Sequence, residues 1–415
     1  MEQVSVWEEL SQVETAKVGE VFRDCIRDVV RLTYYEIMME EVRALCGEKH
    51  LQANLSEFMR AGSAPGIFII DGKTRRIKRP RVRKKAGGKN KEYKLKTYNA
   101  GKNGDEARDL ILRAFLAGVS GREQKNLYPD SPFTSKSSVS RLWVKKGVEK
   151  LEELRNRNIS EDDFFALMLD GIGLGNDLTA IVALGITLDG RKKIIDFQIG
   201  STESSEVCDD LLTRIHTRGF KAKERLLCVL DGSKALKKSV LKRYPDAIMQ
   251  RCTVHKERNI KSYLSKRYHG ELAGKFKTLR KMQGEDDVRE AYDDLRTFLK
   301  KKNSAALESF DEAGESLIAL QLLNVPATLN KSLLSTNIIE NPFRNVRAKI
   351  GRVKRWRSET DQPSRWMAYA LLEVEKGFRR IKGYQDIPLL VNKLKRQGAS
   401  VSCTEEEQPL ADMNP

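Results

Sequence analysis

The sequence has no run of 18 or more apolar residues, although 40% of its 415 residues are hydrophobic. A membrane-spanning helix needs about 20 such residues, so we expect none. The chain starts with acidic residues and has no basic start followed by an apolar core, so we predict no secretory signal. Its six cysteines are scattered rather than grouped. This pattern is typical of free thiols in a reducing cytoplasm and excludes a disulfide-stapled scaffold.

Acidic residues are in the minority. The chain has 58 Asp and Glu against 76 Lys and Arg, which gives a formal net charge of +18. A surplus of this size usually indicates a polyanionic partner, most often nucleic acid and less often an anionic membrane. We therefore predict a soluble intracellular protein that binds nucleic acid.

The charge is unevenly distributed along the N-terminal part. Apolar residues at helical spacing predict helices over residues 1–60, which are acidic, and we assign 1–72 to a helical region for interaction or dimerisation. Thirteen of the residues in 73–96 are basic and one is acidic. Pro80 and the Gly87-Gly88 pair exclude a long helix there, so we expect an extended arm or weak strands.

Three helices are predicted after the basic segment, over 106–117, just after 118 and over 135–154. In the third helix Val139 and Trp143 have the spacing of inward-facing residues. This order is typical of a helix-turn-helix, so residues 73–160 form our predicted DNA-binding domain. The expected DNA contacts are Lys136, Ser138, Ser140, Arg141 and Lys145 in the third helix and Arg81, Arg83 and Lys84 in the arm.

The pattern changes to short apolar runs in residues 161–255. Three strands in meander order, followed by helix, strand, helix and strand, predict a mixed-sheet α/β domain. Residues 256–334 are charged and almost entirely helical in pattern, and 335–395 begin with another helix. The polar, acidic tail 396–415 is predicted to be disordered.

Two of the apolar runs end in Asp-Gly: "FFALMLDG" at Asp170 and "LLCVLDGS" at Asp231. Asp-Gly is also an ordinary turn signal. If the first and fourth strands are neighbours, however, both carboxylates emerge side by side at one edge of the sheet. Oxygen ligands of this kind favour Mg²⁺ or Mn²⁺, and a pair of ions can promote phosphodiester cleavage.

Glu340 is the candidate for a third carboxylate. It lies in the first turn of a helix that follows Ser335-Thr336-Asn337, where the helix dipole favours an acidic side chain. Arg344 and Arg347 follow on the same face, where they are suited to phosphate contacts. The alternative is a surface Glu340 paired with Arg344, and the local sequence does not exclude it.

Cys252 and His255 form a C-x-x-H element at the end of the last predicted strand. Half of a zinc site would need a second Cys/His pair nearby, and none follows. Burial in the core is the main interpretation, and a supporting role near the carboxylates stays open.

Four segments occur in a characteristic order: "MLDGIG", "CVLDGSKAL", "MQRCTVHKERNI" and "STNIIENPFRNVR". Together they resemble the Mutator superfamily of DDE transposases, specifically its bacterial insertion-sequence branch. The segments "EEVRALCGE", "KRPRVRKK" and "SKSSVSRLW" extend the resemblance over roughly residues 20–395.

The resemblance implies an RNase H-like catalytic domain that is interrupted by an all-helical insertion. Asp170, Asp231 and Glu340 would hold two Mg²⁺ ions, with Mn²⁺ as a substitute, and Cys252 and His255 would support the site or contact DNA. The partners implied are double-stranded DNA, as terminal inverted repeats and target, and a second copy in a homodimer. The implied location is the bacterial cytoplasm, at the nucleoid. The helical segment has no Trp, so a hairpin-forming mechanism has no support.

Two other functions stay open at this level. One is a structure-selective nuclease of the RNase H-like kind, against which the large basic N-terminal half argues. The other is a DNA-binding regulator with an inactive core, whose signature would be the loss of an acid. All three acids are present.

Overall fold

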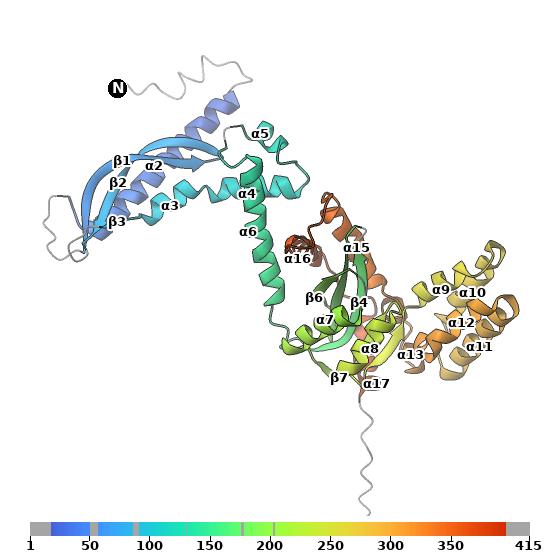
Figure 1. Ribbon diagram of the computed structural model, residues 1–415. Helices are drawn as coiled ribbons and strands as arrows, with labels where there is room; N and C mark the ends of the chain where they lie inside the picture. Colours follow the sequence, from blue (N-terminus) through green and yellow to red (C-terminus); the bar gives the residue numbers. More distant parts are fainter. Residues whose placement is uncertain are drawn as a thin grey trace, which may run out of the picture. The chain divides into compact units, whose positions relative to one another are not determined.

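The computed structural model describes residues 18–49, 57–85, 91–129, 131–175, 178–201 and 204–395. The chain divides into two compact units, residues 1–146 and 147–415, with the boundary inside helix α6 (Lys136–Arg155). Both units combine helices with an open sheet (Figure 1). The tail that we predicted to be disordered lies outside the described residues.

The first unit is built on a three-stranded antiparallel sheet of order β1-β2-β3. Its strands are β1 (Phe58–Ile70), β2 (Lys73–Lys84) and β3 (Lys91–Tyr93), and helix α2 (Val18–Cys46) packs against it. Met38 and Val42 of α2 meet Phe68 and Val82 of the strands in a small buried core.

The prediction that the N-terminal 72 residues are helical is therefore wrong for residues 58–70. Asp71 and Gly72 both have positive φ, at 49° and 75°, which is the conformation of a tight two-residue hairpin turn. This turn pairs the apolar end of β1 with the basic segment. The basic segment is consequently a regular strand of twelve residues, where we expected an extended arm or weak strands.

Helices α3 (Lys96–Asn103), α4 (Asp105–Leu116), α5 (Glu123–Leu127) and α6 follow, so α4, α5 and α6 match the three predicted helices. Ser120 and Glu123 form a reciprocal capping box at α5. Val139 and Trp143 are buried as predicted, and the Trp143 ring lies 6.4 Å from that of Phe115 in α4.

The second unit contains a five-stranded mixed sheet. Its strands are β4 (Phe164–Gly173), β5 (Thr179–Thr187), β6 (Lys192–Gly200), β7 (Ala222–Leu230) and β8 (Ile248–Arg251). Their order is β6-β5-β4-β7-β8; the β4-β5-β6 pairs are antiparallel, and β4-β7 and β7-β8 are parallel. The first and fourth strands are thus neighbours, which is the condition under which Asp170 and Asp231 emerge side by side.

Helices cover both faces of this sheet. On one face α7 (Ser205–Thr217) and α8 (Lys234–Arg243) contribute Leu211 and Val240 to a core with alternate residues of β4 and β7. On the opposite face lie α15 (Asn337–Ile350), which contacts β4, and α16 (Gln362–Glu375), which contacts β6; α17 (Ile387–Leu394) contacts β7. The sheet is therefore buried as the middle layer, which explains its nearly continuous apolar strands.

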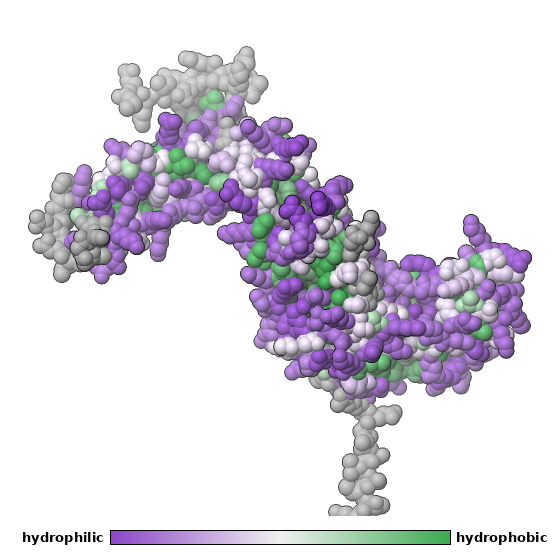
Figure 2. Space-filling view, viewed as in Figure 1, coloured by the Kyte–Doolittle hydropathy of each residue, from purple (hydrophilic) through white to green (hydrophobic). Residues whose placement is uncertain are grey.

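The segment between β8 and α15 is helical, with a core of its own around Phe276, Leu295 and Phe310. It comprises α9 (Thr253–Ser262), α10 (His269–Leu279), α11 (Glu285–Lys302), α12 (Ser304–Ala313), α13 (Ala319–Leu322) and α14 (Asn330–Leu333). Its visible surface is mostly hydrophilic (Figure 2). Lys256 is fully buried, and its Nζ lies 2.6 Å from both Glu312 Oε2 and the Ser309 carbonyl, which ties α9 to α12. Within the described ranges, no helix is long and apolar enough to cross a membrane.

Gly232, directly after β7, is a glycine whose backbone conformation makes substitution costly. Its φ of +116° is one that side chains of L-residues rarely adopt, and a Cβ there would also displace the guanidinium group of Arg251. We expect Gly232→Ala to lower the free energy of unfolding by about 2 kcal/mol or more, measured in urea. Gly274→Ala in α10 is the control, because no atom lies near its Cβ position. It should stabilise the protein by about 0.5–1 kcal/mol. Equal effects would contradict the steric argument.

Candidate active site

Asp170 and Asp231 are placed by the parallel pairing of β4 and β7. Leu169 pairs with Leu230, so Asp170 is the next residue of β4 and Asp231 is the residue directly after the end of β7. Leu169 and Leu230 both belong to the core beneath α7 and α8. Because successive side chains alternate between the two faces of a sheet, both aspartates point to the opposite face, toward α15. The structure thus brings the two predicted acids side by side.

We had predicted that Asp170 is the last residue of its strand, and this prediction is wrong. β4 continues to Gly173, because Gly171 and Ile172 pair with β5 on the other side. Asp170 is consequently buried, with 5% of its surface exposed. Burial, together with the negative charge of Asp231, raises the pKa of Asp170 to about 8; the charge of Glu340 acts in the same direction. One carboxylate oxygen accepts a hydrogen bond from the Gly171 N–H at 2.9 Å.

Asp231 is half-buried in the turn that leaves β7. Its Oδ1 accepts a hydrogen bond from the Ser233 N–H at 3.0 Å, and the Ser233 side chain caps α8. Arg251 occupies the space that the missing side chain of Gly232 leaves open. A glycine after each aspartate suggests room for metal and phosphate, but at Gly232 a guanidinium occupies that room.

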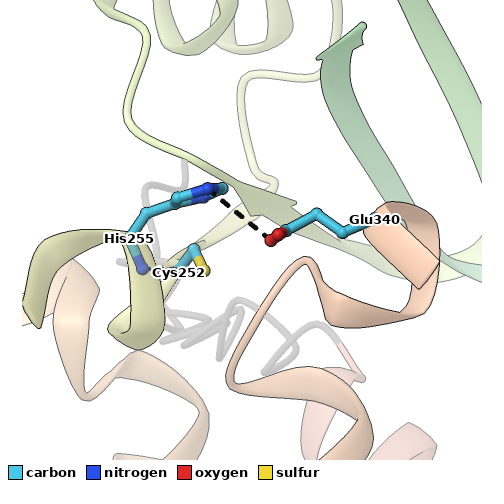
Figure 3. A group of neighbouring side chains, drawn as sticks. All are labelled: Cys252, His255 and Glu340. Atoms are coloured by element: carbon cyan, nitrogen blue, oxygen red, sulfur yellow. Dashed lines mark hydrogen bonds and ion pairs between the residues drawn. The ribbon is translucent and has the colours of Figure 1, made fainter. Parts of the chain in front are cut away.

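Cys252, His255 and Glu340 form a compact group on the same side of the sheet (Figure 3). Their ligand atoms all lie within 4.8 Å of one another, and His255 Nε2 is 3.6 Å from Glu340 Oε1. Glu340 is in the first turn of α15, as predicted. Its contacts are with His255 and Thr336, so the alternative of a surface Glu340 paired with Arg344 does not describe this structure.

Thr336 is the site residue that sequence reasoning missed. We had treated it as part of a helix cap, but its side chain makes no capping bond. Thr336 is fully buried. Its hydroxyl donates a hydrogen bond to Glu340 Oε1 at 2.8 Å. The same oxygen lies 3.3 Å from His255 Nδ1 and 3.5 Å from Cys252 Sγ. This one hydroxyl contacts all three side chains. Its role is visible only in the tertiary structure, where the segments of Cys252 and His255 meet that of Thr336.

The same contacts shift the titration of Cys252 and His255. Burial raises the pKa of Cys252, but hydrogen bonds from His255 and Thr336 outweigh it, and the pKa is lowered overall. Hydrogen bonding with Cys252, supported by the charges of Glu340 and Asp170, raises the pKa of His255 to about 9 against the effect of burial. A thiol, an imidazole and a carboxylate are ligands that zinc accepts. Cys252 Sγ, however, already accepts hydrogen bonds from two backbone N–H groups and one hydroxyl.

The remaining predicted side chains are on the surface. Asn337, Arg344 and Arg347 are exposed on α15. On α6, Lys136, Ser140, Arg141 and Lys145 are exposed, and Ser138 is half-buried, bonded to Ser135. On β2, Arg81 pairs with Glu92 at 3.0 Å and Lys84 with Glu57 at 3.1 Å, while Arg83 is half-buried.

The sequence of this chain matches a family model described as "Transposase, Mutator family" over residues 1–368. The chain belongs to the Mutator family of transposases. The resemblance drawn from the sequence motifs is thereby confirmed.

Known transposases of insertion sequences are similar to this Mutator-family chain. The transposase for IS1201 of Lactobacillus helveticus is 28% identical over 253 residues, which are 58% of this chain and 66% of the relative. The transposase for IS256 in transposon Tn4001 of Staphylococcus aureus is 29% identical over 252 residues, or 58% and 63%. That for IS905 of Lactococcus lactis is 24% identical over 255 residues, or 60% and 63%. The chain thus spans less than two thirds of the length of these relatives.

Asp170 should destabilise the metal-free protein in a pH-dependent way. Its folded-state pKa of about 8 lies above the ordinary 3.8, so stability present at low pH is lost as the pH rises between these values. We expect Asp170→Asn to raise the free energy of unfolding in EDTA, on the order of a few kcal/mol at pH 8 and little at pH 4. The exposed Asp293→Asn is the control, with a change below about 0.5 kcal/mol. A gain that does not depend on pH would contradict the assignment.

Proposed function

We propose that this protein is a DDE transposase that binds the terminal inverted repeats of an insertion sequence and catalyses metal-dependent DNA strand cleavage and strand transfer. One observation carries the proposal. Asp170 and Asp231 follow paired residues of neighbouring parallel strands and point to the face from which α15 presents Glu340. The strand order and the acid on the later helix support an RNase H-like catalytic domain with residues 256–334 as an all-helical insertion.

The chemistry of the donor set fits divalent cations. Burial raises the pKa of Asp170 far above its usual range, and the negative charges of Asp231 and Glu340 act in the same direction. Carboxylates gathered in this way are stabilised by a hard cation, for which they are the preferred ligands. Asp170, Asp231 and Glu340 would hold two Mg²⁺ or Mn²⁺ ions, which would supply charge stabilisation of the attacking and leaving oxygens of a phosphodiester.

The protein's own residues have distinct tasks in this proposal. The sheet fixes the separation of Asp170 and Asp231, because Asp170 lies within β4 and Asp231 directly follows the end of the strand that pairs with it. Thr336 and His255 hold the Glu340 carboxylate in one orientation through Oε1. Cys252 anchors this arrangement from the buried end of β8, where its Sγ accepts the Thr336 N–H at 3.4 Å.

The first unit supplies the proposed DNA-binding surface. Helix α6 exposes Arg141 and Lys145 on the side away from buried Val139 and Trp143, as a recognition helix requires, and Lys136 is exposed in its first turn. The basic strand β2 adds further cations for backbone phosphates.

We also propose that the protein acts as a homodimer on paired DNA ends, at the nucleoid of a bacterial cell. An exposed apolar row on α2 supports self-association: Phe22, Ile26, Val29 and Leu32 are each at least half exposed. A non-catalytic regulator is the second candidate function, and an intact site does not favour it.

Asp231→Asn should abolish cleavage of supercoiled plasmid that carries the element's ends, because the neutral amide is a much weaker ligand for divalent cations. End binding, measured by gel shift, should stay within about twofold of the wild type, a change of about 0.4 kcal/mol. The wild type with EDTA is the matched control and should resemble the variant. Binding by the wild type without any Mg²⁺-dependent cleavage would point instead to the regulator.

Arg141→Ala should weaken binding to the inverted repeats and lower the slope of log K against log salt by about one, if the side chain neutralises one phosphate. The control is Lys150→Ala, also on α6 but paired with Glu153 at 2.6 Å. Salt slopes and end preference equal to those of the wild type would remove α6 as the recognition helix.

A further inference from the structure

A basic cavity lies in the second unit, at the turn between β5 and β6. It has a volume of about 540 Å³ and is lined by six cationic side chains: Arg157, Arg191, Lys192, Lys193, Arg379 and Arg380. Phe378 and Glu375 complete the lining. No residue of the candidate active site takes part in it.

The cavity is remote from the catalytic carboxylates. Thr187, at the end of β5, pairs with Phe164 at the start of β4. Asp170 lies six residues further along β4, which is about 20 Å at the rise of an extended strand. The cavity and the acids are therefore at opposite ends of the sheet.

The cations of this cavity outnumber the carboxylates that neutralise them. Glu375 pairs with Arg157 at 2.7 Å and Asp162 with Lys193 at 2.6 Å, while Asp189 lies 2.6 Å from Arg191 and 3.9 Å from Arg380. Three positive charges are left over from the six lining cations. In the part of the chain that the structure describes, no carboxylate pairs with Lys192 or Arg379.

Lys192 is the informative member of this group. It is half-buried, with its Nζ 5.0 Å from the centre of the Phe378 ring, and burial lowers the pKa of Lys192. A desolvated ammonium without a carboxylate partner is stabilised when an anion enters beside it. An exposed lysine on an ordinary charged surface gains far less, because water already solvates it.

The walls of the cavity are fixed by contacts between distant segments. The Glu375 carboxylate accepts hydrogen bonds from both Arg157 and the Ile194 N–H. The Ile381 N–H donates to the Gly190 carbonyl at 2.9 Å, which holds the turn against the segment after α16. Cations on such supports are held in place for a ligand rather than spread through solvent.

We propose that this cavity is a second anion site, which binds backbone phosphates of double-stranded DNA at the end of the sheet away from the catalytic carboxylates. Lys192 and Arg379 contact the phosphates, because the other cations are engaged by carboxylates. The ligand assignment rests on the proposed function, since a transposase must hold DNA on either side of the point of strand transfer. Free inorganic phosphate has the same chemistry and is the other source to be tested.

The test compares full-length Lys192→Gln/Arg379→Gln with a matched control, Lys376→Gln/Lys382→Gln. The control removes two exposed charges that flank the same segment but do not line the cavity. Binding to a duplex without inverted repeats is measured by fluorescence anisotropy over a range of salt concentrations. We expect the cavity variant to lower the slope of log K against log salt by about two, with roughly tenfold weaker binding at 0.1 M salt, and the control by less than about one.

Equal slopes for the two double variants would overturn the proposal. Arg379→Gln alone guards against misfolding, because its side chain is exposed, and it should lower the slope by about one. If 10 mM inorganic phosphate raised the Tm of the wild type but not of the cavity variant, while DNA slopes agreed, the site would belong to free phosphate and the DNA assignment would fail.

The outcome is independent of the catalytic proposal. Metal-dependent cleavage of ends by the wild type, combined with equal slopes, would refute only the second anion site. A difference in slopes without any cleavage would support the anion site and refute the transposase activity.

Discussion

The parallel pairing of β4 with β7 is the constraint on which the rest of the site depends. Leu169 opposite Leu230 fixes the register, and a shift by one residue would turn one aspartate into the core beneath α7 and α8. With the observed register, the buried Asp170 and the half-buried Asp231 lie on the same face of the sheet. Their mutual repulsion and the burial of Asp170 are unfavourable in the isolated protein. The apolar sheet is therefore what stabilises a geometry that the acids alone would not adopt.

The third acid is positioned by a different kind of contact. Glu340 lies on α15, which follows a long helical segment in the sequence. The orientation of its carboxylate depends on Thr336 and on His255 of α9. Cys252 joins the end of β8 to the start of α15 through its sulfur, while Lys256 joins α9 to α12 through Glu312. The packing of the helical segment and the shape of the site are thus coupled at α9, within a few residues of the C-x-x-H element.

Some errors of the sequence analysis have clear causes. The Asp71-Gly72 pair between an apolar run and a basic run is a strong hairpin signal, yet the density of charge in β2 suggested an arm. The sequence also did not show that Asp170 lies inside its strand. An Asp-Gly pair usually marks the end of a strand, but here the residues after Asp170 still pair with β5. Thr336 carried no signal, since Ser-Thr-Asn before a helix is the usual pattern of a cap.

The sequence by itself determined the element types of the second unit, the two apolar strands that lead into acids, the glutamate in a first helical turn, and a basic charge that indicates a polyanionic partner. These follow from local periodicity and composition, which act over a few residues. Tertiary structure alone decided that Asp170 and Asp231 share a face and that one hydroxyl links Cys252, His255 and Glu340. It also gathered six cations from three segments around one cavity. Such contacts join residues tens to hundreds of positions apart, and packing between elements fixes them rather than any local preference.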